Sequence, residues 1–446
     1  MTSAIGIAQY AGWFGLDLPS SGMPSSTFGY RNFAAGFTIA AIPFVALEIV
    51  RRSRLDSRIC WSLLLFLNGT FLLATRSRAA WAGCVLSLVV ALIAVVWKLR
   101  HQNRISALGL RQSSLMISGA VGLALIFSAT VPHRMQGAGF DAHSTEKATL
   151  SGTIDTTFEP GADKDRFTMW RHTLEMIQAS PFSGVGLGNW QYVYPYFDQG
   201  DVTWKGATPQ RPHNDYLWIA AETGVLGLGI FVWLMISTGA LAIRTARRVK
   251  DQATFLQILA SIASPLAISV HCVFSFPLER IPVTFLGTIG LSILVASDPV
   301  PRSRVREGRF PGFVWLIVAV TQLLAATVVW RATKFDRLAY LQSAAVTGSD
   351  WVGAIRFGTD ALAAGVFDPQ VLLLRGLSHH MSGQFDLAIE DQERCLSYHP
   401  YFVNAINNLG MSLNAAGRFD DRSWKSSLST GHLSGDCSTS RTVGLG

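Results

Sequence analysis

The stretch AAWAGCVLSLVVALIAVVW, residues Ala79–Trp97, decides the fold class of this chain. It carries no charged side chain, and it has the length that a helix needs to cross a hydrocarbon core of about 30 Å. Over all 446 residues, 49% are hydrophobic and only 15% are charged. That balance is more apolar than an ordinary soluble domain, so the sequence predicts an integral membrane protein.

Similar apolar runs recur along the first three quarters of the chain. Together with Ala79–Trp97 they make eight predicted spans, the others being Phe33–Val50, Ile59–Thr75, Ser114–Val131, Val225–Ile243, Phe255–Phe274, Ile281–Ser297 and Gly312–Trp330. The second and seventh spans are the shortest. The pattern predicts an all-α, polytopic transmembrane helical bundle over residues 33–330.

Basic residues set the predicted orientation, because Lys and Arg accumulate in short cytoplasmic loops. Four alternate connections are strongly basic, with Arg51/Arg52/Arg54/Arg58, Lys98/Arg100/Arg104/Arg111, Arg244/Arg247/Arg248/Lys250 and Arg302/Arg304/Arg306/Arg309. Both termini and the long loop 132–215 are therefore expected to be extracytoplasmic, in a bacterial inner (plasma) membrane. The net charge of +8 is spread over these connections, which argues against a nucleic-acid surface.

The first 32 residues show no signal-peptide pattern. An extracytoplasmic N-terminus with no preceding span leads us to expect that upstream helices are missing or that Met1 is not the native start. The five cysteines indicate no metal site or disulfide framework. Three of them lie in predicted spans, and the two in the exported tail, Cys395 and Cys437, lack CxxC spacing.

A 34-residue period begins after Trp330. Aromatic, glycine and acidic positions repeat at this interval, in the pairs Trp351/Phe385, Phe385/Phe419, Gly376/Gly410, Gly383/Gly417 and Asp386/Asp420. This period is typical of tetratricopeptide helix pairs, which residues 331–421 resemble. Such repeats bind protein partners. Residues 422–446 are rich in Ser, Thr and Gly and are predicted to be a disordered tail.

Two arginines stand at a predicted outer boundary, Arg76 and Arg78, within Thr75–Trp81. Basic residues are unusual there. One interpretation is that they reach toward lipid phosphates, an explanation that suits Arg76 better than Arg78. The other is that these permanently charged, forked side chains bind a phosphate or diphosphate of a substrate.

A second group lies in the long loop. Apolar residues at 167, 170, 174 and 177 predict an amphipathic helix on the membrane, with Arg166 near its start. The glycines at 184, 186 and 188 follow it and allow a tight turn that docks the loop. A phosphate-binding nest is the less favoured reading of this turn.

The third group is Arg211-Pro212-His213-Asn214-Asp215, placed directly before an apolar run. A lone histidine is more often structural than catalytic, but the neighbouring Arg211 and the polar residues at the start of a span favour a role for His213. Glu222 is as well explained by a hydrogen bond to Thr223 or to a helix end as by catalysis. His271, Glu279 and Arg280 are expected to be structural or part of the rim.

At these residues the chain resembles the O-antigen ligase and polymerase superfamily of bacterial cell-surface glycan assembly. That family carries a His followed by Asn, Ser or Gln, then nine residues and a glycine-rich span start, as in His213-Asn214, residues 215–223, Gly224 and Gly227. The similarity extends over residues 27–297 through Thr27–Ala34, Ser77-Arg78, Arg166–Trp170 and Pro181–Gly186. Family proteins have several spans before the segment that matches Phe33, which puts the activity of the chain as written in doubt.

The resemblance implies a metal-independent membrane glycosyltransferase that requires no cofactor. Its donor would be a glycan on undecaprenyl diphosphate, and its acceptor a hydroxyl of lipid A core, a growing polysaccharide or a protein. Arg78, Arg166 and Arg211, with Arg76, would hold the diphosphate, because negative charge develops there as the sugar bond breaks. His213 would take the hydroxyl proton or donate a hydrogen bond to phosphate.

Two other classes of protein remain open. A transporter or flippase for lipid-linked sugars would also have many spans and outer arginines, but it would need more charged or Pro-broken positions inside its spans. A non-catalytic scaffold would use the membrane part as an anchor and the repeats to recruit partners.

Overall fold

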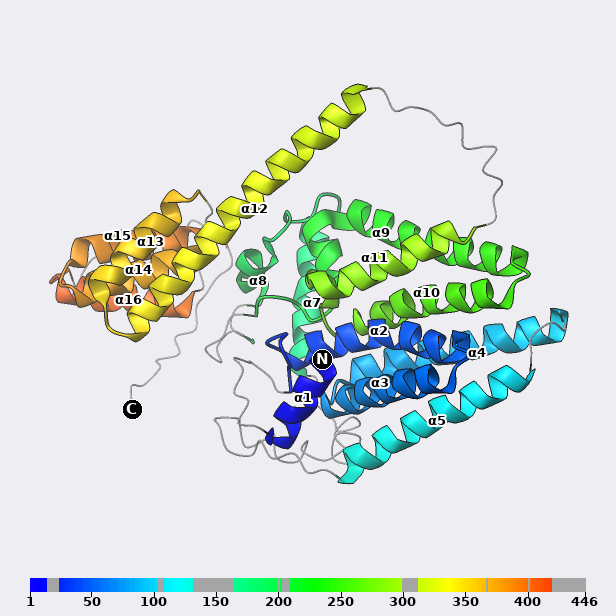
Figure 1. Cartoon of the computed structure of the whole chain (residues 1–446). Helices are drawn as coiled ribbons and strands as arrows, with labels where there is room; N and C mark the ends of the chain where they lie inside the picture. Colours follow the sequence, from blue (N-terminus) through cyan, green and yellow to red (C-terminus); the bar gives the residue numbers. More distant parts are fainter. Residues whose placement is uncertain are drawn as a thin grey trace. The chain divides into compact units, whose positions relative to one another are not determined.

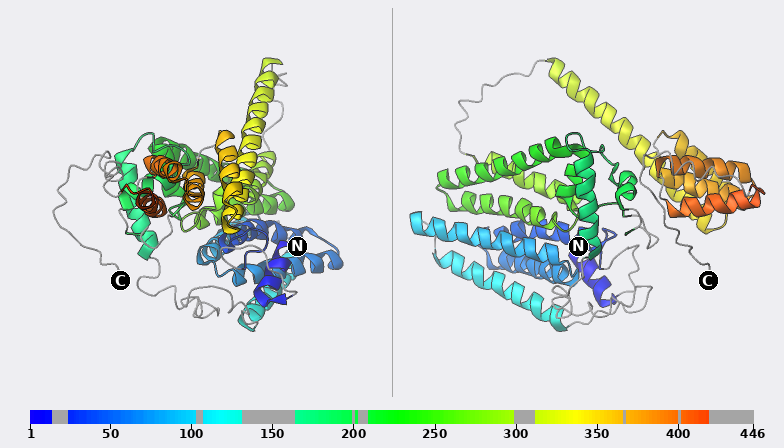
Figure 2. Two further views of the ribbon diagram at one scale, coloured as in Figure 1. Left: turned by 90° about the vertical axis from the view of Figure 1, so that its left-hand side faces the viewer. Right: turned by 180° about the vertical axis from the view of Figure 1, so that it is seen from behind.

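The computed structural model describes residues 1–13, 24–102, 107–130, 164–198, 201–202, 209–298, 312–365, 368–399 and 402–418. Within these ranges every regular element is a helix, which confirms the all-α prediction. The chain divides into two compact units (Figures 1 and 2). The first holds Met1–Trp190 and Arg211–Arg302, and the second holds Gln191–Gln210 and Ser303–Gly446.

The first unit is a bundle of long helices. Its elements are α1 Thr2–Ala11, α2 Arg31–Arg51, α3 Leu55–Ala74, α4 Arg78–Gln102, α5 Ala107–Thr130, α7 Lys164–Ala179, α9 Asp215–Arg248, α10 Gln252–His271, the 3₁₀ turn η5 Pro277–Glu279 and α11 Ile281–Ala296. In Figure 1 the long helices run side by side and α7 lies across their ends. Helix α8, Trp190–Asp198, begins at the last residue of this unit's first segment.

Within the part of the chain that the structure describes, six helices are long and apolar enough to cross a membrane: α2, α3, α4, α5, α9 and α10. They coincide with six of the eight predicted spans. The seventh predicted span is the shorter apolar helix α11, of 16 residues. The eighth lies in α12, Gly312–Thr347, a helix of 36 residues in the second unit.

Small residues let the spans approach closely. Ala35, Ala80 and Ala267, from α2, α4 and α10, pack together in one buried cluster. A Cβ atom on Gly83 would lie only 2.5 Å from the carbonyl oxygen of Ala267, so α4 and α10 touch through backbone. Such contacts are the usual basis of helix association in lipid, where apolar burial alone gives little attraction.

Other faces of the spans carry large exposed apolar side chains. On α9, Leu226, Ile230 and Trp233 are 65% to 68% exposed. Exposed apolar surface on this scale marks an interaction surface. In a membrane protein the partner of such a surface is the lipid bilayer. The faces that the bundle leaves exposed are therefore those that would contact lipid.

Two helices were not predicted from the sequence. Helix α1 packs against α3, where Gly6 leaves the space that the ring of Phe71 fills. Helix α8 contains Pro195. Both helices have ten residues or fewer, too short for apolar periodicity to stand out.

The second unit is a series of helices that follow one another closely, α12, α13 Trp351–Ala363, α14 Pro369–Met381, α15 Phe385–Tyr398 and α16 Val403–Ala415. Trp351 and Phe385, which stand 34 residues apart, each begin a helix. The boundary predicted between Trp330 and Arg331 falls inside α12. The tetratricopeptide assignment stays a prediction. Residues 419–446, including the predicted disordered tail, lie outside the described residues.

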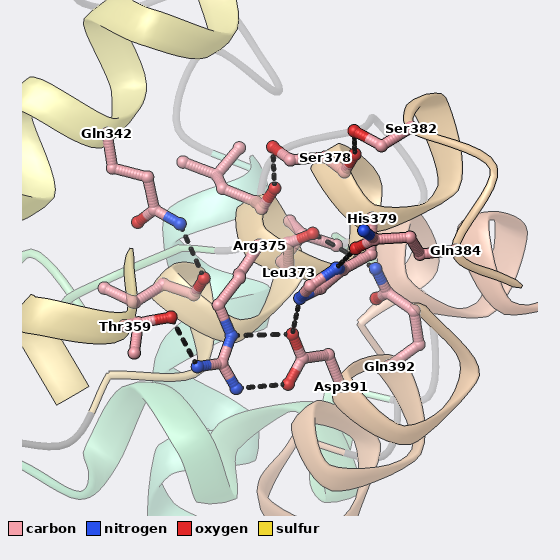
Figure 3. Close-up of polar contacts among 12 residues, drawn as sticks. Gln342, Thr359, Leu373, Arg375, Ser378, His379, Ser382, Gln384, Asp391 and Gln392 are labelled. Atoms are coloured by element: carbon pink, nitrogen blue, oxygen red, sulfur yellow. Dashed lines mark hydrogen bonds and ion pairs between the residues drawn. The ribbon is translucent and has the colours of Figure 1, made fainter. Parts of the chain in front are cut away.

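A polar network lies in the core of this unit (Figure 3). The guanidinium of Arg375 on α14 donates to both carboxylate oxygens of Asp391 on α15, at 2.6 Å and 2.8 Å, and to Thr359 of α13 at 3.1 Å. Gln342 and Gln392 donate to backbone carbonyls of α14. These bonds join four helices and leave Arg375 with partners on two of its neighbours.

Candidate functional site

Four helices of the first unit, α2, α4, α9 and α11, begin at one end of the bundle. The amide of Asp215, at the start of α9, donates to the carbonyl of Cys272 just after α10 ends, at 2.9 Å. Arg280, just before α11, stacks on the ring of Phe33 at the start of α2, at 3.7 Å. Ala80 near the start of α4 packs with Ala35 of α2. This end, called the motif end below, therefore brings the predicted patches together.

Arginines stand at the starts of three of these helices. Arg31 is the first residue of α2, Arg78 the first of α4, and Arg280 the N-cap of α11. None of the three has an acidic residue in its first turn. A helix N-terminus already carries partial positive charge, so an arginine there is electrostatically unfavourable. Three such placements at one end favour the binding of an anion, which would relieve the repulsion.

The loop that carries His213 is fixed from three sides. Its own helix is capped by Asn214, whose side-chain oxygen accepts from the amides of Tyr216 and Leu217 at 3.0 Å and 3.1 Å. The carboxylate of Asp215 accepts from the amide of Leu278 at 3.2 Å. Trp170 of α7 donates to the carbonyl of Pro212 at 2.8 Å. Asn214 and Asp215 are thus explained as structural supports that hold His213 in place.

The backbone of two predicted site residues is strained. His213 has φ of 56° and Arg76 has φ of 53°, in the left-handed region that side chains other than glycine rarely adopt. Among the described residues only Ser26 and Ser349 are also non-glycine positions with positive φ. Strain of this kind costs about 1–3 kcal/mol and tends to occur at functional sites, so it favours a role for both residues.

The imidazole of His213 is mostly buried and neutral. Its ring meets Phe276 edge-on, with 5.1 Å between centroids, and its Nδ1 has no hydrogen-bond partner. Burial, and then the nearby charge of Arg166, lower the pKa of His213 from 6.5 to about 4. At neutral pH the ring is therefore unprotonated and able to accept a proton. An anion bound beside Arg166 would raise this pKa again.

The other predicted arginines have distinct settings. Arg211 pairs with Glu279 at 3.2 Å and lies over the ring of Trp218 at 4.6 Å, so a carboxylate already shares its charge. Arg76 is buried and donates one bond, to the Tyr10 hydroxyl of α1 at 2.8 Å. Its Nε and Nη1 have no hydrogen-bond partner. The structure thus turns Arg76 toward α1, and no contact links it with His213.

Helix geometry places Arg78 at the motif end. Gly83 touches Ala267 across the α4 and α10 contact. Counting toward the motif end, Arg78 is five residues from Gly83 and His271 is four from Ala267, which correspond to rises of about 7.5 Å and 6 Å. Arg78 and His271 therefore lie at nearly the same depth in the bundle.

The glycine turn docks the loop on α9, as expected. The amides of Val185 and Gly186 donate to the carbonyls of Ala221 and Glu222, at 2.9 Å and 3.0 Å. A Cβ on Gly184 would overlap the backbone of Glu222, so only glycine fits. Because two amides of the turn are used in this way, they do not form a phosphate nest.

Docking also explains Glu222 and the break in α9. The carboxylate of Glu222 accepts from the amide of Trp190, which begins α8, at 3.1 Å. Its role as a helix-end partner is confirmed. Gly224 has φ of 67° and ψ of −174°, which separates a short motif helix from the span that follows. The start of the predicted span at Val225 is therefore a real break.

Three further residues stand at this end. Arg31 had no predicted role, whereas His271 and Arg280 were expected to be structural or part of the rim. The first and last are visible in retrospect as basic residues at apolar boundaries on the predicted outer side. His271 is fully buried at the end of α10, and the charge of Arg166 acts on it as it does on His213. An ionisable residue at the end of a span is a recognised signal of a site.

The fold and this end define a polytopic helical membrane protein that concentrates arginines where four of its helices begin. Residues 63–232 match the O-antigen ligase family. The matched segment runs from α3 into α9 and contains all five predicted site residues, Arg76, Arg78, Arg166, Arg211 and His213. No curated protein is significantly similar to the chain. The match supports an O-antigen ligase-like glycosyltransferase function in general terms.

Proposed function

We propose that this chain transfers a glycan from undecaprenyl diphosphate to a hydroxyl acceptor at the extracytoplasmic face of the membrane. The observation that carries the proposal is the set of arginines at the motif end. Arg78 begins a helix there, and the charge of Arg166 contributes to lowering the pKa of His213. Arg211 precedes His213 by two residues. The same segment is the one similar to O-antigen ligases.

The arginines act on the leaving group. As the bond between the anomeric carbon and the diphosphate oxygen breaks, negative charge grows on the diphosphate. Fixed guanidinium groups stabilise that charge more in the transition state than in the ground state, which lowers the barrier. In this proposal the arginines take the charge-neutralising role, with Arg78 and Arg166 central and Arg211 at the rim. Arg76 contributes from its position against α1.

His213 acts on the acceptor. Its neutral ring takes the proton of the attacking hydroxyl while the hydroxyl oxygen bonds to the anomeric carbon. Undecaprenyl diphosphate leaves with the electrons of the broken bond. A single displacement of this kind inverts the configuration of the anomeric carbon. The diphosphate also raises the pKa of His213 while it is bound, because its charge opposes that of Arg166.

The second unit is proposed to recruit protein partners. Its 34-residue period and its paired helices of 13 or 14 residues are the features of tetratricopeptide arrays. In the predicted topology it lies on the same side of the membrane as the motif end. The acceptor itself, whether lipid A core, a growing polysaccharide or a protein, is not encoded in the motif.

The test is a transfer assay on the full chain in lipid nanodiscs. An undecaprenyl diphosphate-linked glycan is supplied with each acceptor class, and the molecule that gains the glycan is identified by mass spectrometry. Arg78→Gln, Arg166→Gln and His213→Gln are expected to abolish most of the transfer. Arg171→Gln is the matched control, since Arg171 is an exposed arginine on the same helix as Arg166. Full transfer by all three variants would refute the enzymatic assignment.

A further inference from the structure

The side chain of His271 is the most unusual buried polar group of the motif end. It is 0% exposed, and neither Nδ1 nor Nε2 has a hydrogen-bond partner. More than nine in ten buried polar groups in proteins are bonded, and each exception calls for an explanation such as a bound ligand or water. The ring cannot be explained as a helix cap or as half of an ion pair, since both nitrogens lack partners.

The surroundings of His271 place it beside the proposed substrate site. The carbonyl of the next residue, Cys272, accepts the amide of Asp215, two residues from His213. The positive charge of Arg166 acts on both His213 and His271. His271 also lies at nearly the depth of Arg78. His271 therefore lies at the same end of the bundle as the groups proposed to hold the diphosphate.

The ring of His271 lies next to Gly36 of α2. A methyl group on Gly36 of α2 would lie 3.4 Å from Nδ1 of His271 and 3.3 Å from Pro277. These short distances show that α2 packs closely against both the imidazole and the turn after α10. The turn itself is fixed by the bond from Leu278 to Asp215, so the loop of His213 and the ring of His271 share one support.

We propose that His271 is a further substrate-binding residue, whose ring N–H donates a hydrogen bond to an oxygen of the donor diphosphate. This inference rests on the proposed function, because it takes the diphosphate as the anion that the arginines hold. A bond to a charged acceptor is strong and is more effective in a dry environment. The alternative occupant is an ordered water, which would make His271 structural.

The experiment measures binding of undecaprenyl diphosphate to the full chain in nanodiscs, with undecaprenyl monophosphate as a second ligand. His271→Phe keeps the ring and removes both nitrogens, and we expect it to weaken diphosphate binding about tenfold, as the loss of one hydrogen bond to a charged group would. His271→Gln returns an N–H and should recover most of the affinity. The thermal midpoint of His271→Phe should not fall, since no protein bond is lost.

A matched control is His399→Phe in the second unit. His399 is also a buried histidine with an unpartnered Nδ1, and it stacks on Phe402 with ring centroids 4.8 Å apart. It should leave diphosphate binding unchanged. Wild-type affinity in His271→Phe would overturn the inference, and so would loss of affinity in both His271 variants in proportion to lost thermal stability. If Arg166→Gln also binds like wild type, the proposed function itself fails.

Discussion

Two arginines, the buried Arg76 of the first unit and the half-buried Arg375 of the second, show opposite solutions to the same electrostatic problem. Arg375 in the second unit has a bidentate carboxylate and a hydroxyl as partners. Arg76 in the first unit has one phenol hydroxyl, and two of its guanidinium nitrogens have no hydrogen-bond partner. A buried charge is costly unless it is paired. The paired arginine stabilises a core, whereas the underpaired one stands at the end where we propose that an anion binds.

The comparison predicts that the second unit loses stability when its pair is broken. Asp391→Ala leaves the half-buried Arg375 without its carboxylate and should destabilise the helices α13 to α15 by roughly 1.5–3 kcal/mol, the effect of losing a hydrogen bond between charged groups. Hydrogen exchange of the full chain measures this as lost protection. The double variant Arg375→Met with Asp391→Leu should recover most of it, because no charge remains buried. Unchanged protection in Asp391→Ala would show that Arg375 does not depend on its partner.

At the motif end the expected loss is in activity. Arg166→Gln should lower glycan transfer about 100-fold, the usual effect of removing one group that stabilises transition-state charge. The loss of transfer should be larger than any change in the thermal midpoint explains, because the guanidinium acts on charge that develops in the transition state. Arg171→Gln on the same helix should transfer normally. If Arg166→Gln loses stability and activity together, Arg166 stabilises the fold as Arg375 does and has no separate role in transfer.

The break in α9 gives a third prediction. A Cβ on Gly224 would overlap the carbonyl of Phe182, and its φ of 67° with ψ of −174° is accessible to glycine. Gly224→Ala should cost about 2 kcal/mol and reduce transfer by displacing the glycine turn that docks on α9. Gly229→Ala on the same helix is the control, since a methyl group there meets no atom within 4 Å. Equal effects of the two changes would argue against a docked loop.

Capping is expected to have a smaller effect. Asn214→Ala removes the side chain that accepts from the amides of Tyr216 and Leu217, at a cost of about 1 kcal/mol. Thermal unfolding of the full chain measures it. Asn214→Ser keeps a cap and should be nearly neutral. If Asn214→Ser instead loses transfer without losing stability, the side chain of Asn214 contacts substrate.

The smallest predicted effect concerns pH. The pKa of His213 is lowered from 6.5 to about 4, so the free enzyme should keep its base as the pH falls well below 6.5. The acid limb of kcat/KM is expected nearer pH 4. Between pH 6.5 and 4 the unfolded chain binds a proton that the folded state does not, so stability falls as pH falls. Arg166→Gln should move the residual acid limb upward, and an unmoved limb would separate Arg166 from His213.

Much of the fold could be predicted because long apolar helices can be recognised from local composition. The runs from Phe33, Ala79 and Phe255 became α2, α4 and α10, since a lipid-crossing helix depends on local composition alone. The amphipathic pattern of residues 165–177 became α7 for the same reason. Short helices such as α1 were not predicted, because ten residues give too little periodicity to recognise a helix.

The sequence by itself determined the membrane class, the spans and the motif that carries His213 and the arginines. Only the tertiary structure decided which of these residues have partners. It paired Arg211 with Glu279, gave Glu222 to a helix end and left the ring of His271 buried without a hydrogen bond. The reason is physical: hydrophobic periodicity is a property of neighbouring residues, whereas the satisfaction of a buried polar atom depends on groups brought from distant parts of the chain.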